Sequence, residues 1–254
     1  MMDEDVDPFK PTHTQWVTLY TLLIFLVTLS ISWNLKYART VIYTGKLLTV
    51  AFHEGCHALA TVLTGGKVNS IQLDPNMGGV TSMDGGWLFL SVRILPAGYI
   101  GSTFIGASLI FASFDQKASK IACFPVWAMM LFVMWCARKD MFVLCHVTFS
   151  LGMTLALFII AHGVFLRFFV MYIGVMNVMY TVWDILDDLV FQKFAESDCS
   201  AFARRYPWMP SQAWGTVWFA IAFCGLLAGV LGGLTLFKDD FSSQLKNAQT
   251  FLPT

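Results

Sequence analysis

The sequence LLTVAFHEGCHALATVLT occupies residues 47–64 and sets His53, Glu54 and His57 in the middle of an apolar, helix-like run. Residues four apart share one face of a helix, so the two imidazoles can bind one metal ion while Glu54 reaches a water molecule beside it. Ionisable groups are costly in a lipid-buried helix and are therefore usually functional there. The chain has only five histidines, so this spacing indicates a metal site more strongly than an ordinary polar helix face.

The composition around this motif is typical of a membrane protein. Hydrophobic residues make up 57% of the chain and charged residues 13%, whereas soluble domains average about 25% charged residues. The formal net charge is zero and no long basic tract occurs, which argues against a nucleic-acid partner. We therefore expect an all-α, multi-pass protein in a lipid bilayer. The endomembrane system fits this expectation, but the sequence fixes neither organelle, orientation nor oligomeric state.

Seven runs are apolar and long enough to span a bilayer, which takes about 20 residues. The long stretch after residue 141 is expected to break at His162-Gly163. The fourth and fifth runs could instead form one re-entrant element and one span, which would give six spans. We expect one integral domain over 1–254, with a zinc-binding core at 40–114 and 167–190 and tails at 1–14 and 238–254. The seven runs are 15–33, 40–64, 87–114, 118–136, 141–161, 167–190 and 212–237.

Two connections between these runs are longer than the others. The first, 65–86, predicts a β-hairpin, because β-prone residues at 68–73 and 79–82 flank the turn-forming sequence Asp74-Pro75-Asn76-Met77-Gly78. The second, 192–211, reads as a loop that carries Glu196, Asp198, Arg204 and Arg205 and ends in an aromatic cluster around Trp208, which is typical of a membrane interface.

Two histidines leave a catalytic zinc site incomplete, because such sites use three protein ligands. Asp184, Asp187 and Asp188 lie on one face of the sixth run. If the second and sixth spans cross in the same direction, Asp184 lies within about 4 Å of the histidine pair in depth, and the other two lie roughly one turn further along. We therefore predict Asp184 as the third ligand. The alternatives are that Asp187 or Asp188 replaces it, or that the triplet marks the helix end.

The remaining polar residues in the apolar runs have simpler interpretations. His146 lacks an acidic neighbour on its helix face, and His162 falls at an expected helix end, so both read as hydrogen-bonding groups. Asn177 could lie near the site or pack between helices. Small residues in the third run, such as Gly98 and Gly106, favour close helix packing.

A resemblance to a known family follows from three segments. The run His53-Glu54-Gly55-Cys56-His57-Ala58-Leu59-Ala60, then Thr64-Gly65-Gly66-Lys67-Val68 and Gly78-Gly79-Val80-Thr81, resembles the site-2 protease family of intramembrane zinc metallopeptidases. It looks closest to the site-2-protease-like branch found in fungi and plants. The resemblance implies that His53 and His57 bind zinc and that Glu54 is the catalytic glutamate.

The sequence also departs from this family pattern. Classical members carry the ligand aspartate in a Leu-Asp-Gly element, where this chain has Trp183-Asp184-Ile185-Leu186-Asp187-Asp188. Leu95-Pro96-Ala97-Gly98-Tyr99 stands where the family usually has Gly-Pro-x-x-Asn, and no Asn follows. These differences concern the third ligand and the handling of substrate.

The expected function is hydrolysis of a peptide bond within or near a transmembrane helix of a membrane-protein substrate. Zinc would activate a water molecule, and Glu54 would take its proton and pass it to the leaving amine. Gly79, Val80 and Thr81 are expected to bind an unwound stretch of substrate by strand addition. The alternatives are a non-proteolytic scaffold or chaperone-like relative, and an ion or solute carrier. The carrier ranks last because no paired repeats occur.

Overall fold

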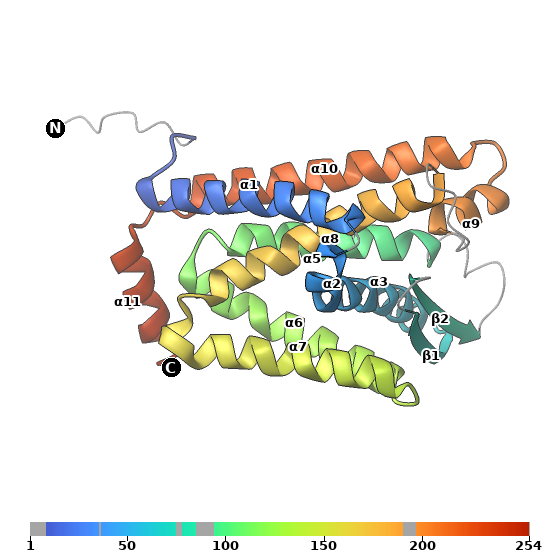
Figure 1. Cartoon of the computed structure of the whole chain (residues 1–254), viewed down its shortest axis with the longest axis horizontal. Helices are drawn as coiled ribbons and strands as arrows, with labels where there is room; N and C mark the ends of the chain where they lie inside the picture. The colour runs from blue at the N-terminus through green and yellow to red at the C-terminus, as the bar shows by residue number, and fades with distance from the viewer. Residues whose placement is uncertain (1–8, 36, 75–77, 85–93, 190–196, 254) are drawn as a thin grey trace.

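The computed structural model of the chain describes residues 9–35, 37–74, 78–84, 94–189 and 197–253. Long helices lie side by side, with a small β-hairpin at one end (Figure 1). Within the described residues, six helices are long and apolar enough to cross a membrane. The protein is therefore an integral, multi-pass membrane protein. The six are α1 (His13–Asn34), α5 (Leu95–Ala112), α6 (Gln116–Cys136), α7 (Met141–Ile159), α8 (Leu166–Leu189) and α10 (Ser211–Leu236).

The predicted second span corresponds to α3 (Tyr43–Leu63), which follows the short helix α2 (Ala38–Val41) and is not among the six. Seven spans are therefore not confirmed. Helix α3 has 21 residues, or about 32 Å of length, but its two histidines and glutamate lower its mean hydropathy. Every residue from Leu47 to Ala58 is buried, so protein rather than lipid surrounds these polar groups.

Local sequence signals explain where the other helices begin and end. The carboxylates of Asp115 and Asp140 accept hydrogen bonds from the first free backbone amides of α6 and α7. The expected break after α7 is confirmed: a 3-10 turn, η1 (Ile160–Gly163), ends at Gly163 with φ of +77°, and α8 then begins. Helix α5 begins at Leu95 with Pro96 in its first turn, and residues 87–93 of the predicted third run lie outside the described residues.

Small residues allow the central helices to pack closely. A Cβ atom added to Gly106 of α5 would lie 2.7 Å from the carbonyl oxygen of Gly174 on α8. One added to Gly229 of α10 would lie 2.6 Å from the carbonyl oxygen of Ala107. Backbone-to-backbone packing of this kind drives helix association where lipid replaces water.

Helices α3, α5 and α8 contact one another and form the core, as the sequence predicts. In the most apolar 18-residue stretch of each helix, 67% of α8 is buried, compared with 22% of α1 and 28% of α10. Helix α1 packs on α8, and α10 packs along α5 and α8, so both lie on the outside of the core. Helices α3 and α8 run in the same direction in Figure 1.

The predicted hairpin is confirmed as β1 (Lys67–Asp74) and β2 (Gly78–Asp84), an antiparallel pair with Ile71 opposite Thr81. Strand β2 contacts α3, and β1 also contacts α6 and α7. Turn residues 75–77 lie outside the described residues. The hairpin covers the end of α3 that follows the histidines (Figure 1).

Two regions predicted as loop or tail contain helices. Helix α9 (Asp198–Arg205) lies within the predicted loop 192–211, and α11 (Phe241–Phe251) lies within the predicted tail 238–254. The Ser197 hydroxyl accepts a hydrogen bond from the Ser200 amide at the start of α9. Asp198 in its first turn and arginines in its last turn complement the helix dipole. Helix α9 lies at the same end of the molecule as the hairpin (Figure 1).

Candidate metal centre

Helix α3 holds the two motif histidines against each other. Their Nε2 atoms are 3.1 Å apart, and their ring planes cross at 80°. His53 is 3% exposed and His57 is 5% exposed, so neither imidazole is solvated. Residues four apart on a helix share one face, which is why the two rings meet.

The carboxylate of Asp198 completes a three-donor group. Its Oδ2 atom lies 3.0 Å from Nε2 of His53 and 2.9 Å from Nε2 of His57. Asp198 is the first residue of α9, so this short helix delivers the carboxylate to the histidines. Within the described part of the chain, His53, His57 and Asp198 form the one group of three such donors close enough to hold a metal ion.

The contact between His57 and Ile94 turns the other ring nitrogen of His57 toward Asp198. Its Nδ1 atom lies 2.7 Å from the carbonyl oxygen of Ile94. Because a carbonyl only accepts, Nδ1 carries the proton, and neutral His57 presents a lone pair at Nε2. That lone pair faces the carboxylate of Asp198, which also only accepts. With His57 neutral, a cation between the two atoms would relieve this repulsion.

The charge of Asp198 is consistent with this view. Burial raises the pKa of its carboxyl, but the neighbouring His57 and His53 outweigh that effect and hold the pKa well below its usual range, so Asp198 is ionised beside the two rings. The donor set therefore fits zinc, which prefers two or three imidazoles with a carboxylate. Three donor atoms within 3.1 Å of one another can each lie about 2 Å from a single ion.

Glu54, between the two histidines in sequence, lies against strand β2 of the hairpin. The Thr81 hydroxyl of β2 donates to Oε2 of Glu54 at 2.7 Å. A Cβ atom added to Gly79 would lie 2.5 Å from Cγ of Glu54, so the β2 backbone contacts the glutamate side chain directly. The side chain of Val80 points away and is 66% exposed. Two of the three residues predicted to bind substrate thus contact Glu54.

Gly98 of α5 packs directly against the imidazole rings of His53 and His57. A Cβ atom at this position would lie 2.4 Å from Nε2 of His57 and 2.4 Å from Cε1 of His53. The element Leu95-Pro96-Ala97-Gly98-Tyr99, singled out in the sequence, therefore passes directly over the ligand atoms. Only glycine leaves room for them.

Asp184, the predicted third ligand, lies beside this group and is not part of it. Its Oδ2 atom accepts a 2.6 Å hydrogen bond from the hydroxyl of Tyr99. The argument from depth brought Asp184 near the histidines, and the Tyr99 ring to which it bonds lies 5.4 Å from the ring of His53. It did not anticipate a carboxylate reaching the histidines from outside the spans. The side chains of Asp187 and Asp188 lie outside the described residues, so their roles remain untested.

The short helix that carries Asp198 could have been predicted from a weaker sequence signal. Ser197-Asp198 followed by Ala201, Phe202 and two arginines is the pattern of a short capped helix. Helices of eight residues are easily mistaken for loops when the flanking sequence has no apolar periodicity. His146 and Asn177 bond to backbone carbonyls of their own helices, whereas the simpler interpretations predicted groups that lie between helices or at the interface.

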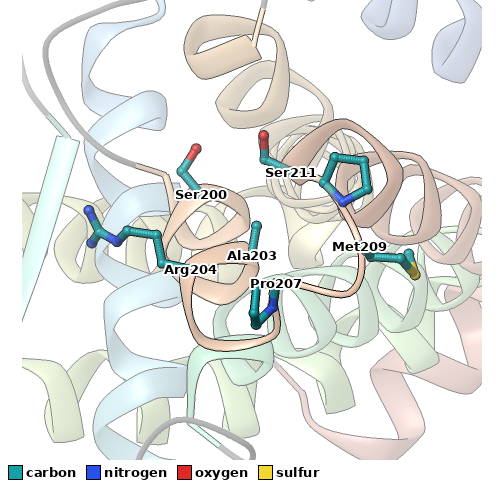
Figure 2. A pocket seen from close by; sticks show the side chains of 7 residues that line it. Ser200, Ala203, Arg204, Pro207, Met209 and Ser211 are labelled. Atoms are coloured by element: carbon teal, nitrogen blue, oxygen red, sulfur yellow. The ribbon is translucent and has the colours of Figure 1, made fainter.

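A surface cavity of about 430 Å³ lies between α9 and the start of α10 (Figure 2). In Figure 2 the hydroxyls of Ser200 and Ser211 lie on one side of it, and the Arg204 side chain extends away from the other labelled residues. None of the three metal donors lines it, so we do not assign it to the substrate of the metal centre. Its lining residues are Ser200, Ala203, Arg204, Pro207, Met209, Pro210 and Ser211.

A His-Glu-x-x-His helix with a convergent carboxylate, set in a bundle of membrane-spanning helices, defines the class of intramembrane metallopeptidases. The chain belongs to the Peptidase M50B-like family, whose sequence model matches residues 17–229. That match includes His53, Glu54, His57, Asp184 and Asp198, and it supports the resemblance to site-2 proteases, which are zinc enzymes. Comparisons with curated proteins and with solved structures gave no match.

Proposed function

We propose that the protein is an intramembrane zinc protease that cuts a peptide bond within or near a transmembrane helix of a membrane-protein substrate. The observation that carries this proposal is the convergence of Nε2 of His53, Nε2 of His57 and Oδ2 of Asp198 beside Glu54, in a chain of the Peptidase M50B-like family. We propose Asp198, in place of Asp184, as the third ligand. An assignment to the fungal and plant branch remains a further proposal.

His53, His57 and Asp198 would hold the ion, which supplies Lewis-acid polarisation of the substrate carbonyl and activates water at neutral pH. The Ile94 carbonyl fixes the tautomer of His57 and so keeps its Nε2 lone pair directed inward. Glu54 takes the proton of the attacking water and delivers it to the leaving amine. The Thr81 hydroxyl orients the carboxylate of Glu54 through their 2.7 Å hydrogen bond.

Burial of the centre determines how a substrate must approach. His53, Glu54 and His57 are each at most 5% exposed, whereas the Asp198 side chain is 20% exposed. A substrate helix hides its carbonyl groups in its own hydrogen bonds and must unwind before attack. We propose that the unwound stretch pairs with β2 along Gly79, Val80 and Thr81, directly above Glu54.

The test combines metal content with proteolysis. Full-length protein purified in detergent without chelator should carry about one zinc per chain. The variants His57→Ala and Asp198→Asn should lose most of it, whereas His146→Ala should keep it. Glu54→Gln should also keep its zinc, because Glu54 is not one of the three donors.

Cells expressing the wild-type protein or Glu54→Gln can then be compared by mass spectrometry of protein termini. We expect new termini within transmembrane segments in the wild type that are missing in Glu54→Gln. Equal sets of termini, with zinc present in both proteins, would identify a non-proteolytic scaffold instead. Wild-type protein that stays zinc-free after zinc is added back would refute the metal centre.

A further inference from the structure

The hydrogen-bonded pair of Tyr99 and Asp184 has no part in the chemistry described above. The Tyr99 hydroxyl donates to Oδ2 of Asp184 at 2.6 Å, and Tyr99 is 1% exposed. Tyr99 belongs to α5 and Asp184 to α8, so the bond joins two of the three core helices. An ionisable group inside a membrane-spanning helix is costly unless it serves a function.

The ring of Tyr99 contacts a metal donor on one side. Its centroid lies 5.4 Å from that of His53, with the ring planes at 61°, which is an edge-to-face contact. The hydroxyl bond to Asp184 restrains the position of this ring. A rotation of Tyr99 would therefore remove one of the two tyrosine rings that pack on His53, the other being Tyr180 at 4.9 Å.

On its other side, Tyr99 packs with the helix that carries the third donor. It forms one buried cluster with Cys199, Phe202 and Trp218, and its ring centroid lies 6.0 Å from that of Trp218. Cys199 is fully buried and directly follows Asp198. A helix of eight residues is not stable alone, so tertiary contacts of this kind determine where α9 lies.

We propose that Tyr99 and Asp184 are a positioning pair, which holds α9 and the ring of His53 so that Asp198 meets both histidines. Asp184 fixes the Tyr99 hydroxyl, the hydroxyl fixes the ring, and the ring supports His53 on one side and the residues after Asp198 on the other. The pair acts on the metal centre without touching the ion. This inference rests on the proposed metal centre, although not on its proteolytic activity.

Zinc affinity measured by competition with a chromophoric chelator tests the pair on the full chain in detergent. We expect Tyr99→Phe and Asp184→Asn each to weaken binding by about 10- to 100-fold, the usual effect of removing a group that orients a ligand. Because both variants break the same hydrogen bond, the double variant should bind no more weakly than the weaker single variant. Tyr172→Phe removes a hydroxyl elsewhere on α8 and should bind as the wild type does.

A second measurement separates positioning from general stability. The cobalt-substituted Tyr99→Phe and Asp184→Asn proteins should show altered visible spectra, because the coordination geometry changes. Their chelator-treated forms should unfold at nearly the wild-type temperature. Lower unfolding temperatures with wild-type zinc affinity and spectra would overturn the proposal and leave the pair a purely structural role.

Asp198→Asn and His57→Ala separate failure of the pair from failure of the centre. Both should lose more affinity than either Tyr99→Phe or Asp184→Asn. If Asp184→Asn loses as much as Asp198→Asn while Tyr99→Phe loses nothing, Asp184 is itself a ligand and the pair is refuted. If Asp198→Asn and His57→Ala bind zinc normally, the metal centre itself is wrong, and the proposed function fails with it.

Discussion

Replacing Gly98 by alanine tests how tightly α5 confines the metal centre. The added methyl carbon would lie 2.4 Å from Nε2 of His57 and 2.4 Å from Cε1 of His53, whereas real Cβ contacts are essentially never below 3.0 Å. The structure must therefore open by at least 3.0 − 2.4 = 0.6 Å at a donor atom. Neither ring can simply rotate away, because both are nearly fully buried.

Moving α5 instead would not relieve the contact without cost. The carbonyl of Ile94, at the start of α5, holds Nδ1 of His57 at 2.7 Å. A shift of α5 away from the rings would stretch this bond and release the imidazole. We expect Gly98→Ala to weaken zinc binding about 10- to 100-fold, or about 1.4–2.8 kcal/mol. Overpacking should also lower the free energy of unfolding by about 1–3 kcal/mol.

Gly152→Ala is the matched control, since an added Cβ there meets nothing within 4 Å and the residue lies within α7. That variant should gain about 0.5–1 kcal/mol of stability, because alanine favours helix more than glycine does, with no change in zinc affinity. Chelator competition and thermal unfolding in detergent measure both quantities. Wild-type zinc affinity in Gly98→Ala would show that the donors do not meet against α5 as described.

Three further outcomes follow from contacts outside the donor set. Thr81→Val should keep zinc but lower the rate of cleavage at least 10-fold, because Glu54 loses its orienting hydrogen bond; an unchanged rate would leave Thr81 no role in orienting Glu54. Gln244→Leu should lower the free energy of unfolding by about 1–3 kcal/mol, since buried Gln244 donates to the backbone at the end of α5; thermal unfolding measures this, and zinc content should not change. His146→Ala should retain full zinc content, and a loss of zinc would mean that a fourth donor had been overlooked.

The sequence predicted those elements of the fold that form through interactions between residues close together in the chain. Apolar runs of about 20 residues and the turn chemistry around Asp74–Gly78 follow from hydrophobicity and backbone preference alone. The pairing of His53 with His57 follows from helical periodicity. Six of the seven apolar runs and the two strands were confirmed, because each depends on residues close together in the chain.

The third donor could not be obtained in the same way, because its position depends on a tertiary contact. Asp198 is 141 residues from His57 and lies on a helix that the buried cluster of Tyr99, Phe202 and Trp218 holds in place. Depth along α8 put Asp184 at the level of the histidine pair, and Asp184 bonds to Tyr99, whose ring contacts His53. Depth alone could not show that Asp184 bonds to Tyr99 while a different carboxylate, that of Asp198, reaches the histidines.

The position of the third donor on α9 also meets two opposing requirements, a low cost of burying a carboxylate and access of water to the site. A carboxylate deep in hydrocarbon costs about 2.5–3.5 kcal/mol, yet peptide hydrolysis consumes water at the same place. Asp198 lies on α9, which is not one of the six candidate membrane spans. Its side chain is 20% exposed, whereas His53 and His57 are enclosed by protein. The centre is thus half built from a buried helix and half from a helix at the end of the bundle. In that arrangement the charge of Asp198 lies near the surface, and Asp184, within the span, bonds to Tyr99 and positions its ring.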